Sequence, residues 1–174
     1  MNTRYPATLL NGVTLRIRAE REVTRGRAAI LKAYYLKNPH PDVPKEVLSV
    51  SLNEVSANIP YDLGRLFSVL ESIQEAANPG INATIKDKYF NSAAATPGVI
   101  FPILINLAQK HLKKLRSSNA GLVIFYEKQI TELCSCLGKS YPARMSLSQQ
   151  GAFQLGYYHQ TQARYQKKEE KEHV

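Results

Sequence analysis

The sequence predicts an all-α fold, a single compact helical bundle of six or seven helices. Apolar residues recur at three- and four-residue spacing along most of the chain, as they do on one face of a helix. The segments with this spacing are separated by short stretches rich in proline, glycine and asparagine. Helices of this kind bury their apolar faces against one another around one core.

Length and composition predict one helical domain over residues 1–174. Apolar residues make up 44% of the chain and charged residues 21%, which is typical of a packed globular protein. We expect residues 1–5 and 168–174 to be flexible ends, and residues 38–60 to form a connecting loop.

The sequence of the first half of the chain predicts three helices. The first spans Pro6–Glu22, and the second runs from Thr24, a candidate N-cap, to Lys37. Residues 38–44 contain three prolines and end the second helix. In residues 45–60 apolar and polar residues alternate briefly, which fits either a short strand or a loop. The third helix spans Tyr61–Ala77.

A tight corner is predicted after a shorter helix over Ile81–Phe90. The helical run ends at Asn91 and Ser92, three alanines follow, and the chain restarts with Thr96 as N-cap and Pro97 at the first helical position. The helix over residues 97–117 has a predicted buried stripe and an outward basic face. The stripe contains Ile100, Phe101, Leu104, Leu107, Ala108, His111, Leu112 and Leu115, and Lys110, Lys113 and Arg116 point away from it, with Lys114 at the margin.

Two further helices complete the prediction. One spans residues 119–137 and ends at Gly138, and the last is capped by Ser146 and runs to about Lys168. Gly151 and Gly156 lie within the last helix, where we expect them to allow close approach of another helix.

The charge of the chain predicts an anionic partner. The formal net charge is +9, and the first forty residues hold eight basic groups against two acidic ones. No apolar run is long enough to span a membrane, and we expect no membrane partner. The two cysteines, Cys134 and Cys136, are too close in sequence for an unstrained disulfide, which favours a reducing, cytoplasmic location.

No cofactor, metal site or catalytic group is predicted. The four histidines are scattered, and Asp42, Asp62 and Asp87 show no metal-binding spacing. His111 is expected to be a core residue, and His159 to bond either a backbone carbonyl or a phosphate. Cys134 would be a nucleophile only beside a base, so we expect the protein not to be an enzyme.

A distributed basic surface is the candidate nucleic-acid-binding site. Its residues are Arg18, Arg21, Arg25, Lys86, Lys88, Lys110, Lys113 and Arg116. Tyrosines lie among them in the sequence, and these pack in the core or stack unpaired bases, with core packing favoured. They are Tyr34, Tyr35, Tyr89, Tyr157 and Tyr158.

Several stretches together resemble a known family, the large subunit of type I-C CRISPR systems, in its C-terminal region. They are Tyr61-x-Leu-Gly-Arg-Leu-Phe-x-Val-Leu-Glu71, Ile81-Asn-Ala-Thr-Ile-x-Asp-x-Tyr-Phe-x-Ser92 with Ala95-Thr-Pro97, Tyr126-Glu-Lys128, and Gln150-Gly-x-Phe-x-Leu-Gly-Tyr-Tyr-His-Gln160. In such systems this region is also made separately, by internal translation initiation, as the small subunit of the Cascade effector complex. The start at Met1 favours the separate small subunit.

The resemblance implies an all-α, non-enzymatic subunit present in more than one copy beside the Cascade backbone and large subunits. It would help to hold the guide RNA–target DNA heteroduplex and the displaced single-stranded DNA, forming an R-loop without reading sequence. The resemblance also implies that a separate helicase-nuclease cleaves the target DNA. Two alternatives remain at this point: a scaffold whose basic faces dock acidic surfaces of neighbouring subunits, and a metal-dependent nuclease or other enzyme.

Overall fold

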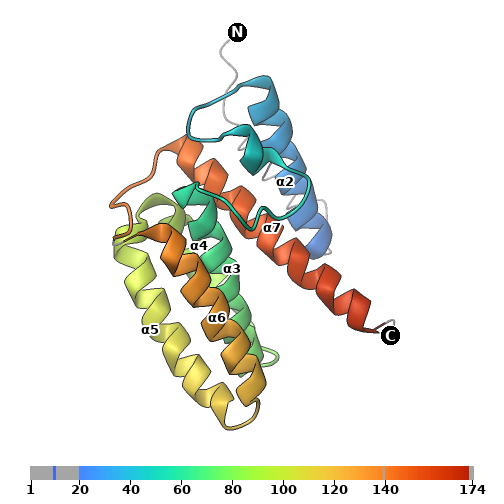
Figure 1. Ribbon diagram of the computed structural model, residues 1–174, viewed down its shortest axis with the longest axis vertical. Coiled ribbons are helices and arrows are strands. Elements are labelled where there is room, and N and C mark those ends of the chain that lie inside the picture. The colour runs from blue at the N-terminus through green and yellow to red at the C-terminus, as the bar shows by residue number, and fades with distance from the viewer. Residues whose placement is uncertain (1–9, 11–19, 139, 173–174) are drawn as a thin grey trace.

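The computed structural model describes residue 10, residues 20–138 and residues 140–172, and within them the protein is all-α (Figure 1). No β-strand occurs in these ranges, so the predicted fold class is confirmed. The elements are α2 (Glu20–Lys37), η1 (Lys45–Leu48, a 3-10 turn), α3 (Ile59–Ala77), α4 (Ile85–Ala95), α5 (Pro97–Arg116), α6 (Ala120–Leu137) and α7 (Leu147–Glu172).

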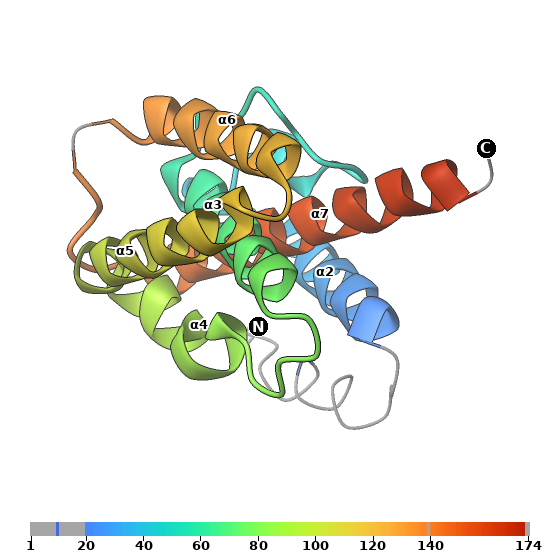
Figure 2. The same cartoon turned by 90° about the horizontal axis from the view of Figure 1, so that it is seen from below.

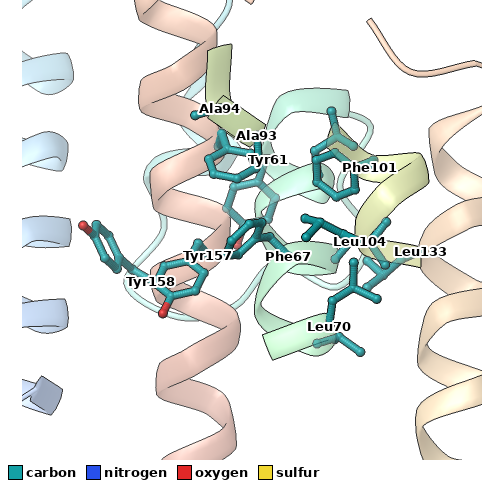
Figure 3. Packing of buried hydrophobic residues seen from close by; sticks show 14 of the residues in the cluster. Tyr61, Phe67, Leu70, Ala93, Ala94, Phe101, Leu104, Leu133, Tyr157 and Tyr158 are labelled. Atoms are coloured by element: carbon teal, nitrogen blue, oxygen red, sulfur yellow. The ribbon is translucent and has the colours of Figure 1, made fainter. Parts of the chain in front are cut away.

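Helix α3 lies at the centre and is surrounded by α4, α5, α6 and α7 (Figure 2). Its residues from Tyr61 to Ile73 are all buried, which matches a helix with neighbours on every side. Helix α2 packs on the outer side of α7. Figure 3 shows Phe67 of α3 close to Tyr157 of α7, with their ring centroids 5.9 Å apart and nearly perpendicular. Phe90 of α4 contacts both rings, so three helices share one aromatic cluster.

Two glycines allow α3 and α7 to pack backbone against backbone. A Cβ atom added at Gly64 would lie 1.9 Å from the carbonyl oxygen of Phe153, and one added at Gly156 would lie 1.9 Å from that of Tyr61. No side chain fits at either distance. The expectation that Gly156 allows close helix approach is therefore confirmed, and a Cβ atom added at Gly151 would lie 2.1 Å from the Tyr35 hydroxyl of α2.

Polar side chains bond across the same α3–α7 contact. The Tyr61 hydroxyl lies 2.8 Å from His159 Nδ1, and Arg65 Nε donates to Gln160 Oε1 at 3.2 Å. Further along, the hydroxyls of Ser68 and Thr161 lie 2.9 Å apart. Because buried polar groups are costly unless paired, these bonds also select one register of the two helices.

Several helix ends agree with the sequence. Lys37, Ala77 and Leu137 end their helices as expected, and Pro97 stands in the first turn of α5. The Asn119 side chain accepts a bond from the Leu122 N–H, so Asn119 is the N-cap of α6 and not, as expected, its first residue. The Ser146 hydroxyl accepts from the Gln149 N–H, so the predicted cap at Ser146 is confirmed.

The corner before α5 differs from the expectation. Helix α4 begins at Ile85 rather than residue 81, because Thr84 and Asp87 form a reciprocal capping box there. It then continues through the three alanines to Ala95, since alanine is the best helix former. The expected break at Asn91 and Ser92 is wrong. Thr96 is also not a side-chain N-cap for α5, because its hydroxyl donates to the Ser92 carbonyl.

The N-terminal half also departs from the expectation. Most of the helix expected over Pro6–Glu22 lies outside the described residues. Helix α2 already includes Glu20, the first described residue after residue 19, so a helix start at Thr24 is wrong; no glycine or proline separates the two positions. Helix α3 begins two residues earlier than expected, because Asn58 caps it.

The segment before α3 is a loop, and the strand alternative is wrong. Side chains rather than a partner strand bond its backbone: Lys32 donates to the Val50 carbonyl, and Tyr61 accepts from the Asn53 N–H. Arg65 donates to the Glu54 carbonyl. The loop is therefore held against α2 and α3 by three long side chains.

We predict that Gly156→Ala destabilises the protein by about 3 kcal/mol, because the added methyl group must push α7 away from Tyr61. Urea unfolding followed by circular dichroism measures the change. Gly121→Ala is the matched control, since its new Cβ would meet nothing closer than 3.8 Å. A free energy of unfolding for Gly156→Ala within about 0.5 kcal/mol of wild type would contradict this packing.

Candidate nucleic-acid interface

The outward face of α5 is the clearest basic surface of the described residues. Its buried side is formed by the residues expected there, Phe101, Leu104, Ala108, Leu112 and Leu115, with Ile100, Leu107 and His111 half-buried. Lys110 and Lys113 are exposed and one helical turn apart on the opposite side. No ion pair or hydrogen bond within the described residues occupies either ammonium group. Both lysines are thus available to an external anion.

The other basic groups near the end of α5 have partners within the protein. Arg116 forms an ion pair with Glu127 of α6, which ties the two helices together at their connecting turn. Lys114 Nζ donates to Asn78 Oδ1 at 2.8 Å, at the end of α3. Both side chains are largely solvent-exposed, so these pairs contribute little stability and leave the positive charge at the surface.

Lys86 takes part in a buried cluster where α3, α4 and α7 meet. The Glu71 carboxylate accepts hydrogen bonds of 2.7 Å from the hydroxyls of Thr84 and Tyr157. Burial raises the pKa of Glu71, while these bonds and the nearby Lys86 charge oppose the rise. Lys86 Nζ lies over the Tyr157 ring, 5.4 Å from its centroid. Of the predicted contacts, Lys86 is the one most involved in internal packing.

The remaining candidates are spread over two sides of the molecule. Lys88 is exposed on α4, which packs beside α5. Arg25 is exposed on α2, which packs against α7. Arg18 and the side chain of Arg21 lie outside the described parts of the chain. The structure therefore brings Lys110 and Lys113 together, places Lys88 on the neighbouring helix, and separates Arg25 from them.

The tyrosines mainly build the core. Tyr35, Tyr157 and Tyr158 are almost completely buried, so the favoured core interpretation is confirmed for them and they cannot stack bases. Tyr34 and Tyr89 are partly buried and pack against the same core. Figure 3 shows Tyr158 directed from α7 toward α2, where Arg27 donates to its hydroxyl. Base stacking is consequently not supported by most of this set.

His159 has a structural role rather than a phosphate contact. It is 1% exposed, and its Nδ1 forms a hydrogen bond with the Tyr61 hydroxyl, which also accepts from the Asn53 N–H. The other ring nitrogen, Nε2, has no partner among the described residues. Burial, with a smaller effect of the Lys32 charge, lowers the pKa of His159 to about 3. His111 is half-buried and bonds Asn78, which agrees with the core interpretation.

Sequence reasoning missed the groove between α6 and α7, which contains Phe125 and Arg164. A signal was present in the run of five apolar residues from Leu122 to Tyr126. A helix that packs on one side cannot bury five consecutive apolar residues, so some of them had to face solvent.

The fold and the surface together define a basic all-α protein with two exposed lysines, Lys110 and Lys113, side by side on the outward face of one helix. No helix among the described residues is both long and apolar enough to cross a bilayer. The model of the CRISPR-associated protein family Cas_Csd1 matches residues 1–165, and the chain belongs to that family. A comparison with curated proteins gave no match.

We predict that His159→Gln makes the free energy of unfolding less sensitive to acid. Unfolded histidine binds a proton near pH 6.5 and the folded one only near pH 3, so the unfolded chain gains protons first as the pH falls. The stability of the wild type therefore declines from about pH 6.5 toward pH 3, and histidine accounts for about 2 kcal/mol of the loss by pH 5.

Urea unfolding at pH 7.5 and pH 5 measures the difference. Glu71 and Asp62, whose pKa values are raised by burial, titrate in both proteins and cancel in the comparison. Equal losses of stability in the wild type and His159→Gln would show that the His159 pKa is not lowered.

Proposed function

We propose that this protein is a non-enzymatic small subunit of a type I-C CRISPR RNA-guided surveillance complex, acting in the cytoplasm. In this role it binds nucleic-acid backbone without sequence preference. It stabilises the guide RNA–target DNA heteroduplex and the displaced strand beside the backbone and large subunits. Membership of the Cas_Csd1 family supports a role in a CRISPR complex. The finer assignment draws on the resemblance of its motifs to the type I-C large subunit.

The main support for nucleic-acid binding is that Lys110 and Lys113 are both exposed on α5, in a protein of net charge +9. Phosphate contacts of this kind add affinity without reading bases. Guide pairing supplies the sequence specificity in such a complex, and exchange of strands is nearly balanced in free energy. A few backbone contacts are therefore enough to favour the open R-loop.

Exposure and internal pairing give an order in which to test the candidate contacts. Lys88, Lys110 and Lys113 are exposed and have no internal ion pair among the described residues, so they come first. Arg116 follows, because its pairing with Glu127 must loosen or be shared before it binds phosphate. The scaffold alternative assigns the same lysines to acidic patches on neighbouring subunits. It therefore predicts no contact between α5 and DNA.

We predict that Lys110→Ala with Lys113→Ala weakens R-loop formation and flattens its dependence on salt. Each lost contact to a single strand lowers the slope of log affinity against log salt concentration by about 0.7, so the pair lowers it by about 1.4. Strand opening by assembled complexes, measured across a salt series with a fluorescent base reporter, gives this slope.

Lys37→Ala with Lys45→Ala is the matched control, because both lysines are exposed and lie on α2 and η1 rather than on α5 or the helices packed against it. This control removes the same total charge. An unchanged slope in the α5 double variant, or an equal change in the control, would refute the assignment of Lys110 and Lys113.

A further inference from the structure

A groove of about 640 Å³ opens between α6 and α7, with α3 at its floor. All residues that line it belong to α3, α6 and α7, whereas the lysines described above lie on α5. Its principal residues are Phe125 and Tyr126 of α6, Ala163 and Tyr165 of α7, and Ser72 and Glu75 of α3.

The α6 wall carries a large apolar side chain that the fold does not bury. Val123, Tyr126 and Leu133 form the buried stripe of α6, and Phe125 lies off it with 47% of its surface exposed. Ile124 beside it is 67% exposed. Exposed apolar surface next to a groove of this volume is typical of an interaction site.

The floor of the groove is electrically neutral. Arg164 Nη1 donates to Glu75 Oε2 at 2.8 Å, and the same nitrogen donates to the Ser72 hydroxyl. The guanidinium carbon also lies 5.2 Å from the centroid of the Tyr165 ring. An entering phosphate would meet the Glu75 carboxylate, and an entering ammonium would meet Arg164. The charges therefore favour a neutral group.

Amide side chains at the edge of the groove can form hydrogen bonds with the backbone of a bound polypeptide. Gln160 uses its carbonyl oxygen to accept from Arg65, which leaves its NH₂ group to donate to a carbonyl. Gln129 of α6 lines the groove as well. An apolar side chain flanked by backbone carbonyls satisfies both the apolar wall and these donors.

We propose that this groove binds an apolar side chain on a surface segment of a neighbouring protein subunit of the complex. This proposal rests on the proposed function. It assigns different partners to two surfaces of the molecule, the α6–α7 groove and the outward face of α5. The neutral groove holds protein, and the lysine face of α5 is left for nucleic acid. Charge separates them: the groove pairs its single cation with a carboxylate, whereas Lys110 and Lys113 remain unpaired within the described residues.

The test is incorporation into the complex co-expressed with its other subunits and guide RNA. We expect Phe125→Glu to lower the amount of this chain per purified complex about tenfold or more, as for loss of an aromatic anchor at an interface. Leu147→Glu at the start of α7 is the matched control, because Leu147 is 63% exposed, outside the groove and not on α5. Full incorporation of Phe125→Glu, or equal loss with the control, would overturn the proposal.

A second variant keeps the result interpretable if Phe125→Glu unfolds the isolated chain. Ala163→Tyr fills the groove from the α7 wall without adding charge, and we expect the same loss of incorporation. Circular dichroism of each isolated variant shows whether the helices are retained. Incorporation of a folded Ala163→Tyr at the wild-type level would also overturn the proposal.

A separate experiment tests whether the groove binds nucleic acid instead of protein. Binding of a fluorescent 30-nucleotide single strand by the isolated chain should be unchanged in Phe125→Glu. A loss as large as in the Lys110 and Lys113 double variant would assign the groove to nucleic acid and reject protein docking. Conversely, an unchanged salt slope in that double variant rejects the proposed strand contact, while the incorporation result still decides the groove.

Discussion

The close contact of α3 with α7 is the constraint on which the rest of the structure depends. Gly64 and Gly156 let the two backbones touch, and bonds such as Tyr61 to His159 hold a single register. Once this pair is fixed, α4, α5 and α6 surround the remaining sides of α3, and α2 packs on the outside of α7. The directions of the α5 lysines and the opening between α6 and α7 both follow from that arrangement. A change at the glycines would therefore alter both surfaces together.

The charged residues fall into two groups with different physical roles. Glu71 and Arg65 are buried and bonded within the protein: the Glu71 carboxylate accepts from the Tyr157 hydroxyl of α7, and Arg65 forms an ion pair with Asp62 of its own helix and donates to Gln160 of α7. Lys110 and Lys113 are exposed and lack such partners among the described residues, so their desolvation cost is low and their charge acts outward. Net charge alone does not distinguish the groups. The proposed contacts rest on this distinction and on membership of the Cas_Csd1 family.

Much of the fold could be predicted from the sequence, because periodicity and capping are local properties. The buried stripe of α5 and the cap at Ser146 follow directly from neighbouring residues. The end of α4 was predicted wrongly, because Asn91 and Ser92 favour a break whereas the alanines after them continue the helix to Ala95. The candidate site was predicted less completely. Whether Lys86 faces solvent or covers Tyr157 depends on the packing of residues 71 positions apart in sequence. The groove depends on how the consecutive helices α6 and α7 diverge over α3.

The central claim is that the α5 face contacts nucleic acid in the assembled complex while the α6–α7 groove contacts protein. Site-specific photocrosslinking tests it most directly, with a photoreactive amino acid at position 110 in one protein and at position 125 in another. The account predicts a crosslink to DNA or guide RNA from position 110 and to a protein subunit from position 125, both dependent on target binding or assembly. Crosslinks from position 110 to protein alone would contradict it and favour a scaffold.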